Sequence, residues 1–390
     1  MVTDIPTEEE TAMRNVVIAG YARSPFTPAK KGELAKVRPD DLLAQTLRGL
    51  VERTGADVAE VEDLLVGCAF PEGEQGFNVA RVAVFLAGFP IGMTGVTINR
   101  FCGSSMQAIH SAAGAIQMNA GEAFLCAGVE SMTRVPMLGF NPLPNPALMK
   151  TFPQAFVGMG ETAENLAKQF GISRRRQEEF AVGSQQKAAA AQAEGRLAGE
   201  IVPITWKGGT VTQDGCIRGD TTLEGLAGLK LAFDQNGTVT AGTSSPLTDG
   251  ASATLVCSEE YAAKKGLKPL ARIVSIATSG CGPEVMGLGP VESTRKALAR
   301  AVHALADIVI LELNEAFSSQ SLACIDQLGL DPAKINLDGG AIAIGHPLGA
   351  TGARITGKVA QLLVREGKRY GLATQCIGGG QGIATILEAV

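Results

Sequence analysis

The sequence is poor in the residues and motifs on which several common kinds of chemistry depend. It has three histidines, one tryptophan and 5% aromatic residues among 390 positions. Neither GxxxxGK[ST] nor GxSxG occurs, which excludes the P-loop of nucleotide-binding proteins and the serine elbow of α/β-hydrolases. Histidine-dependent chemistry therefore has three candidates, His110, His303 and His346.

Closely spaced cysteines are also absent. The eight cysteines lie no closer than the 24 residues that separate Cys102 from Cys126, so no CxxC pattern of a redox or zinc site exists. The sequence implies no metal and no permanently bound cofactor. We expect free thiols in a reducing compartment and predict a cytoplasmic protein.

Neither an excess of positive charge nor a long hydrophobic run is present. The net charge of −5 gives no electrostatic basis for binding nucleic acid or an anionic membrane. The longest weakly polar run, residues 82–98, contains Pro90 and is too short to span a bilayer. Residues 1–13 are acidic and lack an apolar core, so we expect a disordered tail rather than a signal peptide.

What the sequence does contain is an alternation of apolar runs and helical patterns, which predicts α/β layers with mostly parallel strands. Amphipathic helices are expected over 40–53 and 293–306. The predicted strands are 16–22, 63–70, 122–128, 272–278, 308–314 and 371–378.

Parts of the two halves of the chain resemble each other. Three matching pairs occur in the same order, at offsets of 237 to 250 residues: Phe70 with Phe317, Ile98 with Ile335, and Cys126 with Cys376. Ordered matches at a nearly constant offset indicate duplication of a strand–helix unit.

The duplication suggests a division of the chain. We expect one half over 14–133 plus 249–269 and a second half over 270–390. Residues 134–248 have no counterpart and are read as an insertion, placed where α/β folds commonly build a ligand cover.

Three titratable groups remain as candidates for chemistry. Cys102 precedes a predicted helix, whose N-terminus favours a thiolate. His346 lies in a Gly-His-Pro loop that cannot be helix interior, and Cys376 is followed by glycines whose backbone can approach a ligand closely. A Cys–His pair is a nucleophile with its activating base. A second thiol suits an acid–base that moves a proton to or from carbon.

With these motifs, residues 14–390 resemble the thiolase family, of the acetyl-CoA acyltransferase (3-ketoacyl-CoA thiolase) kind. The resemblance implies two duplicated mixed-sheet halves in an α-β-α-β-α layering, with the insertion covering coenzyme A. The motifs that carry it are NRFCGSSMQAI (99–109), MGETAEN (159–165), TAGTSSPLTDGA (240–251), NEAF (314–317), GGAIAIGHPLGATGAR (339–354) and CIGGGQG (376–382).

The resemblance also implies a role for each motif residue. Cys102 would be the acyl-accepting nucleophile, His346 its activator, and Cys376 the acid–base for the acetyl-CoA enolate. Asn314 would hold a water that forms one oxyanion hole with His346, and the N–H groups of Cys102 and Gly378 would form the other.

Three further residues correspond to binding positions of the family. Arg218 would lie near the coenzyme A phosphates, Ser245 near the pantetheine, and Met159 in the acyl site. The resemblance implies coenzyme A as substrate rather than cofactor, a homodimer or tetramer, and a hydratase–dehydrogenase subunit as a candidate partner.

Two features favour a degradative thiolase of fatty-acid β-oxidation. Gly158 stands where acetoacetyl-CoA-forming thiolases carry a histidine, and the 130–160 loop is shorter than their tetramerising loop. The alternatives are a biosynthetic acetyl-CoA acetyltransferase and a non-catalytic acyl-CoA or lipid binder. Cys376 and its glycines disfavour a ketoacyl synthase or papain-like hydrolase. His110 and His303 are read as packing or surface residues.

Overall fold

The computed structural model describes residues 13–390, so the tail predicted over 1–13 lies outside it except for Met13. A ten-stranded sheet has the order β10-β11-β12-β9-β1-β8-β5-β3-β4, with β2 paired to β8, and β6 pairs with β7 separately. The strands are β1 (Val16–Arg23), β2 (Thr27–Pro28), β3 (Asp63–Gly67), β4 (Thr94–Ile98), β5 (Ala123–Ser131), β6 (Ile204–Trp206), β7 (Gly209–Val211), β8 (Thr248–Ser258), β9 (Ala271–Gly280), β10 (Ile310–Leu313), β11 (Tyr370–Ile377) and β12 (Gln381–Glu388).

The helices begin and end where local sequence signals favour it. α1, for example, has Pro39 at its first position, Asp40 and Asp41 in its first turn, and left-handed Gly55 directly after its last residue. The helices are α1 (Pro39–Thr54), α2 (Val79–Leu86), α3 (Ser104–Gln117), α4 (Pro146–Thr151), α5 (Met159–Gln169), α6 (Arg174–Ala193), α7 (Leu223–Ala227), α8 (Glu259–Lys265), α9 (Gly289–Ala301), α10 (Ser318–Leu328), α11 (Ala341–Ile344) and α12 (Leu348–Glu366).

The sheet consists of two halves with the same topology, which confirms the predicted duplication. In the first half β4, β3 and β5 are parallel, and β8 and β1 follow antiparallel. In the second half β10 and β11 are parallel, and β12 and β9 follow antiparallel. A parallel bridge from Leu311 to Ile335 stands where the first half has its β3–β4 pair. The halves join through two residue pairs between β1 and β9.

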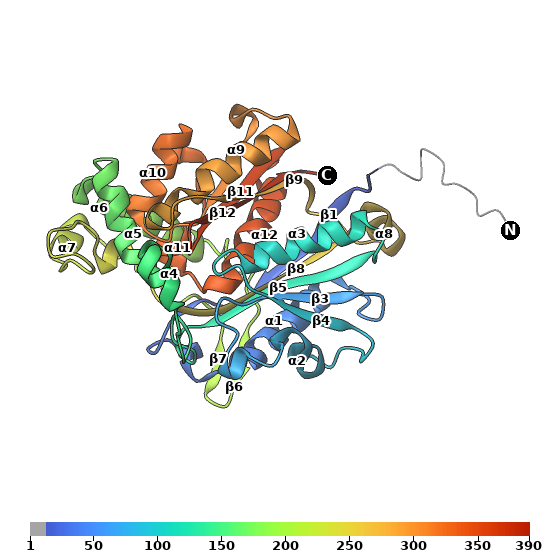
Figure 1. Ribbon diagram of the computed structural model, residues 1–390. Helices are drawn as coiled ribbons and strands as arrows, with labels where there is room; N and C mark the ends of the chain where they lie inside the picture. Colours follow the sequence, from blue (N-terminus) through green and yellow to red (C-terminus); the bar gives the residue numbers. More distant parts are fainter. Residues whose placement is uncertain (1–12) are drawn as a thin grey trace.

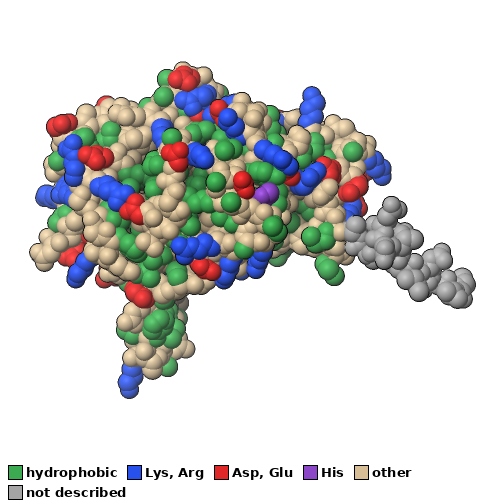
Figure 2. Space-filling view, turned by 90° about the horizontal axis from the view of Figure 1, so that it is seen from above, with side chains coloured by type: hydrophobic (Ala, Val, Ile, Leu, Met, Phe, Trp, Pro, Cys, Tyr) green, Lys and Arg blue, Asp and Glu red, His purple; other side chains and the backbone are tan. Residues whose placement is uncertain are grey.

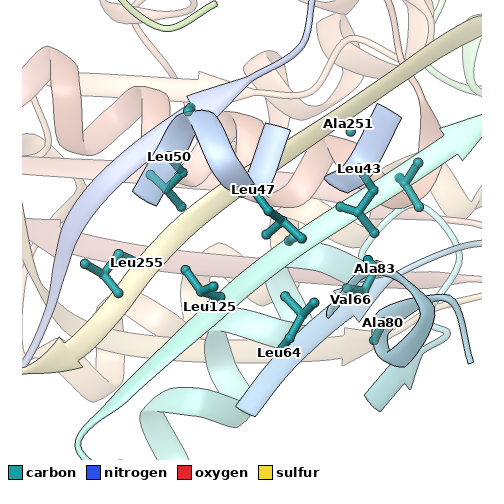
Figure 3. Close-up of a cluster of buried hydrophobic side chains, with 14 of the residues drawn as sticks. Leu43, Leu47, Leu50, Leu64, Val66, Ala80, Ala83, Leu125, Ala251 and Leu255 are labelled. Carbon is teal, nitrogen blue, oxygen red and sulfur yellow. The ribbon is translucent and has the colours of Figure 1, made fainter. Parts of the chain in front are cut away.

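Helices and sheet halves form the expected α-β-α-β-α layering. α1 and α2 pack on the first half, α9 packs on the second, and α3 and α12 lie together between the halves in the centre of Figure 1. Figure 3 shows the apolar contact between α1 and the first half, where Leu43, Leu47 and Leu50 face strand residues such as Leu125 and Leu255. The two central helices bring residues from both halves of the chain to one place.

Two details of the prediction are wrong. Antiparallel pairs outnumber parallel ones, because β8 and β12, which were not predicted, separate the parallel strands of each half from β1 and β9. β8 escaped prediction because its sequence, TDGASATLVCS, is mostly small or polar, although every residue is buried. The helix predicted over 293–306 is α9 and ends at Ala301, because Val302 is left-handed with φ of +56°.

Residues 134–248 hold α4 to α7 and the β6–β7 ladder, and their division from the two halves stays a prediction. On the face shown in Figure 2, basic and acidic side chains are intermixed without a continuous basic stripe. Among residues 13–390, no helix is long and apolar enough to cross a bilayer.

Candidate active site

Cys102 lies between β4 and α3, two residues before the first residue of α3. Phe101, the residue before it, has φ of +43°, a left-handed conformation that is costly for an aromatic residue and is concentrated at functional sites. The turn is fastened because the N–H of Arg100 donates to Ser104 Oγ at 2.9 Å. The predicted setting of this thiol at a helix start is confirmed.

The Cys102 thiol also contacts the C-terminal half. The Cys102 thiol lies beside the backbone N–H of Gly378, and the side-chain amide of Gln375 donates to the Cys102 carbonyl. Burial raises the pKa of the Cys102 thiol to about 11, and the Gly378 N–H opposes this rise. The resting nucleophile is therefore a thiol that needs a base.

Cys376 lies near the end of β11 and is 1% exposed. It packs in one apolar cluster with Met159 and Phe317. Burial raises the pKa of its thiol well above the ordinary value, and the negative charge of a Cys102 thiolate raises it further. In the turn that follows, Gly380 has φ of +79° and a Cβ there would lie 2.3 Å from the Cys281 carbonyl oxygen, so only glycine fits.

His346 lies between α11 and α12, and its orientation is fixed from two sides. Its backbone N–H donates to Thr248 Oγ1 at 3.0 Å, and its ring Nδ1 lies 2.6 Å from Thr351 Oγ1. Because the Thr351 hydroxyl donates to the Pro347 carbonyl at 3.2 Å, this network assigns the proton to Nδ1. Burial, with the charge of Arg354, lowers the imidazole pKa to about 3. At neutral pH His346 is thus a neutral ring whose Nε2 carries the lone pair.

Asn314 completes the histidine side of the site. Its Nδ2 lies 3.4 Å from His346 Nε2, and among residues 13–390 its buried Oδ1 has no hydrogen-bond partner. The histidine and cysteine sides are joined by Leu348, which follows His346 by two residues and packs in the apolar cluster that Cys102 borders. Cys102, Cys376, Gly378 and Met159 thus form one group, and His346 with Asn314 forms its neighbour.

A pocket opens on the 134–248 segment, and none of the residues that line it belongs to this group. Arg218 lines it together with Gln185, Thr221 and Ser244. Arg218 is exposed and forms no ion pair within the described chain. Ser245 is not among the lining residues; its N–H donates to the Ala316 carbonyl at 3.0 Å, which fastens the pocket wall to the NEAF motif.

Two residues of the site were not identified from the sequence. Thr351 orients His346, and the buried carboxylate of Glu130 contacts the loops around it. Nothing in residue type separates Thr351 from Thr356 on the same helix, so its role appears only in three dimensions.

Within residues 13–390, no group of three or more His, Cys, Asp or Glu side chains is arranged to hold a metal ion.

Comparison with known families gives two matches that together cover nearly the whole chain. The model described as "Thiolase, N-terminal domain" matches residues 16–260, and "Thiolase, C-terminal domain" matches residues 267–389.

Individual proteins are similar over the same length. A 3-ketoacyl-CoA thiolase of Bacillus subtilis is 44% identical, covering 96% of this chain and 100% of the relative. One of Pseudoalteromonas translucida is 48% identical, with 97% and 100% covered.

Two solved structures share the fold. A Bacillus anthracis acetyl-CoA acetyltransferase superposes with a TM-score of 0.90 at 40% identity, and human mitochondrial 3-ketoacyl-CoA thiolase with 0.89 at 36%. Each comparison covers 97% of this chain and 100% of the other.

Proposed function

The chain belongs to the thiolase family and has the 3-ketoacyl-CoA thiolase activity of fatty-acid β-oxidation, and from that premise we propose that Cys102 carries the acyl group as a covalent thioester. The observation that supports this role is the position of Cys102 at the start of α3, after the left-handed Phe101 and beside Gly378, in a site with a neutral His346 and a second thiol, Cys376. A nucleophile, a base and a carbon acid–base are the three groups that the reaction needs.

The first half-reaction cleaves a carbon–carbon bond. The Cys102 sulfur attacks the 3-keto carbon while His346 Nε2 takes the thiol proton. The C2–C3 bond then breaks, leaving an acyl thioester on Cys102 and the enolate of acetyl-CoA. Cys376 donates its proton to C2, and acetyl-CoA leaves. The N–H groups of Cys102 and Gly378 stabilise the oxyanion at the attacked carbonyl, and Asn314 with His346 stabilises the enolate through a water.

The second half-reaction restores the enzyme. Coenzyme A attacks the thioester, its thiol proton passes to the Cys376 thiolate, and Cys102 leaves and regains a proton from His346. Coenzyme A is a substrate here, and the chemistry needs no bound cofactor. Arg218 binds the phosphates of coenzyme A, since an exposed guanidinium without an ion pair suits that contact. Ser245 positions the part of the pocket wall that lies along the pantetheine of coenzyme A.

The acyl site suits chains longer than acetyl. Gly158 precedes Met159, and the Met159 sulfur lies 3.6 Å from where a Cβ on Gly378 would stand. A Cβ on Gly158 would face the Glu161 carboxylate at 3.2 Å, so the proposed preference for longer chains rests on the absence of the histidine that acetoacetyl-CoA-forming thiolases carry at this position. Thiolysis across 3-ketoacyl-CoA chain lengths tests the proposal: acetyl-CoA and a shortened acyl-CoA should form with ping-pong kinetics. Cleavage of acetoacetyl-CoA alone would favour the biosynthetic alternative, and no cleavage would favour a binder.

The chain assembles as a homodimer, with a dimer of dimers as the alternative. β4 is the last strand of its half, and its neighbourhood exposes apolar side chains, including Phe85, Ile91 and Val96. Pairing of β4 with a second copy would cover them beside Cys102. Light scattering distinguishes monomer, dimer and tetramer.

We place the protein in the cytoplasm, consistent with eight free cysteines. The candidate partner, a hydratase–dehydrogenase subunit, is tested by pull-down.

A further inference from the structure

Glu130, at the end of β5, is a buried carboxylate with an unusual set of partners. It is 1% exposed and accepts hydrogen bonds from three separate segments of the chain. The donors are the N–H groups of Ala69 (2.8 Å), Phe70 (3.3 Å) and Gly349 (2.9 Å), the Gln75 amide (2.6 Å) and the Cys68 thiol (3.7 Å). A carboxylate buried without a cation needs such donors, but it does not need them from three segments.

One oxygen of this carboxylate joins the two sides of the active site. Oε2 accepts from Gly349, three residues after His346, and from Ala69. The Ala69 carbonyl in turn accepts from the Asn99 amide at 3.0 Å, and Asn99 Oδ1 accepts from the Phe101 N–H at 2.9 Å. The base and the nucleophile are therefore tied through a single acceptor atom.

The contact between Glu130 and the start of α12 is tightly packed. A Cβ on Gly349 would lie 2.9 Å from Glu130 Oε2 and 2.7 Å from the Cys68 Cα. A Cβ on Gly128, two residues before Glu130, would lie 2.2 Å from the Gly349 carbonyl oxygen. Glycine at both positions allows the backbones of β5 and α12 to touch, which brings the Gly349 N–H within hydrogen-bond distance of Glu130.

The charge of Glu130 also acts on the thiol: burial raises the pKa of its carboxyl, and the hydrogen bonds from its backbone and amide donors oppose this rise. All its partners are donors, so a neutral acid would leave its own O–H without an acceptor among them. The titratable groups around it are the Cys68 thiol and, farther away, Cys102. Its charge raises the pKa of the Cys102 thiol.

We propose that Glu130 is a positioning residue for thiolysis, whose carboxylate fixes His346 and Cys102 relative to each other. The inference rests on the roles proposed for those two residues. Glu130→Gln replaces one acceptor oxygen by an NH₂ group, which faces donors whichever way the amide turns. A displacement of the base by even 1 Å lowers a rate by on the order of 10²-fold. We expect that loss in kcat, with the KM for coenzyme A within about twofold of wild type.

A matched control is Glu164→Gln. Glu164 is a buried carboxylate on α5 that accepts from the backbone N–H groups of Thr238 and Val239, neither of which belongs to the Cys102 or His346 loop. It should lose stability without the kcat loss. The pH dependence of Cys102 alkylation by iodoacetamide distinguishes the two variants further. Removing the charge of Glu130 should shift the profile of alkylation rate against pH to lower pH, whereas Glu164→Gln should leave that profile unchanged.

Three outcomes would overturn the inference: a Glu130→Gln kcat within about threefold of wild type, an equal kcat loss in Glu164→Gln, or an unshifted alkylation profile. If Glu130→Gln does not fold, Gly349→Ala disturbs the same contact and keeps the charge; it should lower kcat similarly, and a wild-type kcat would refute the proposal. Alkylation of Cys102 in the wild-type protein without loss of thiolysis would instead refute the proposed role of Cys102.

Discussion

Thr351→Val tests how the base is oriented. Valine has nearly the shape of threonine but cannot accept the Nδ1–H of His346, a hydrogen bond of 2.6 Å at a fully buried hydroxyl. Leaving a buried donor unpaired costs about 1–3 kcal/mol, and this is the preference that holds the proton on Nδ1. Without it the proton can move to Nε2, and a ring protonated there cannot take the Cys102 proton.

The expected loss of activity follows from this energy. Since about 1.4 kcal/mol is a factor of ten, kcat/KM should fall roughly 5- to 150-fold. The assay is thiolysis of a 3-ketoacyl-CoA at saturating coenzyme A, together with the rate at which Cys102 is acylated. The KM for coenzyme A should stay unchanged, because Thr351 is not among the residues that line the Arg218 pocket.

Two matched variants control this experiment. Thr351→Ser keeps the hydroxyl and should retain most activity. Thr356→Val removes another buried hydroxyl of α12, one that donates to the Gly352 carbonyl at 2.7 Å, and should affect stability only. The reasoning is refuted if folded Thr351→Val has wild-type kcat/KM, or if Thr351→Ser loses as much activity as the valine variant.

Three other predictions follow from the structure. Cys376→Ser should slow exchange of the acetyl-CoA methyl hydrogens in deuterated water by ~10²–10⁴ while Cys102 acylation persists; wild-type exchange would show that another group carries the proton. Arg218→Ala should raise the KM for coenzyme A with little change in kcat, and an unchanged KM across an ionic-strength series would contradict the phosphate contact. Burial and Arg100 lower the His110 pKa to about 3, so between pH 6.5 and 3 only the unfolded state binds this proton. The free energy of unfolding should therefore fall as pH falls, by up to about 1.4 kcal/mol per pH unit, and urea titrations of His110→Gln should show a smaller loss.

The sequence predicted the architecture where its signals are local. Apolar strands such as β1 and β11 were found within one or two residues, and the repeat that pairs Ile98 with Ile335 reappears as the matching bridge to Leu311. β8 was not found, because a strand packed by helices on both faces can be built from small residues, and these carry no alternating pattern.

Only part of the candidate site could likewise be predicted from the sequence. Cys102, His346 and Cys376 stand out by residue type and by their glycine or proline neighbours. Glu130 and Thr351 do not, because their importance lies in contacts between segments far apart in sequence, such as the 219 positions that separate Glu130 from Gly349. Motifs therefore identify reacting groups, whereas positioning groups require the coordinates.

The central claim is that Cys102 carries the acyl group, and peptide mapping by mass spectrometry tests it most directly. The protein is mixed with a 3-ketoacyl-CoA in the absence of free coenzyme A, digested, and mapped. We predict an acyl adduct on Cys102 that disappears when coenzyme A is added and does not form in Cys102→Ser. An adduct on Cys376, or turnover without any adduct on Cys102, would contradict the mechanism.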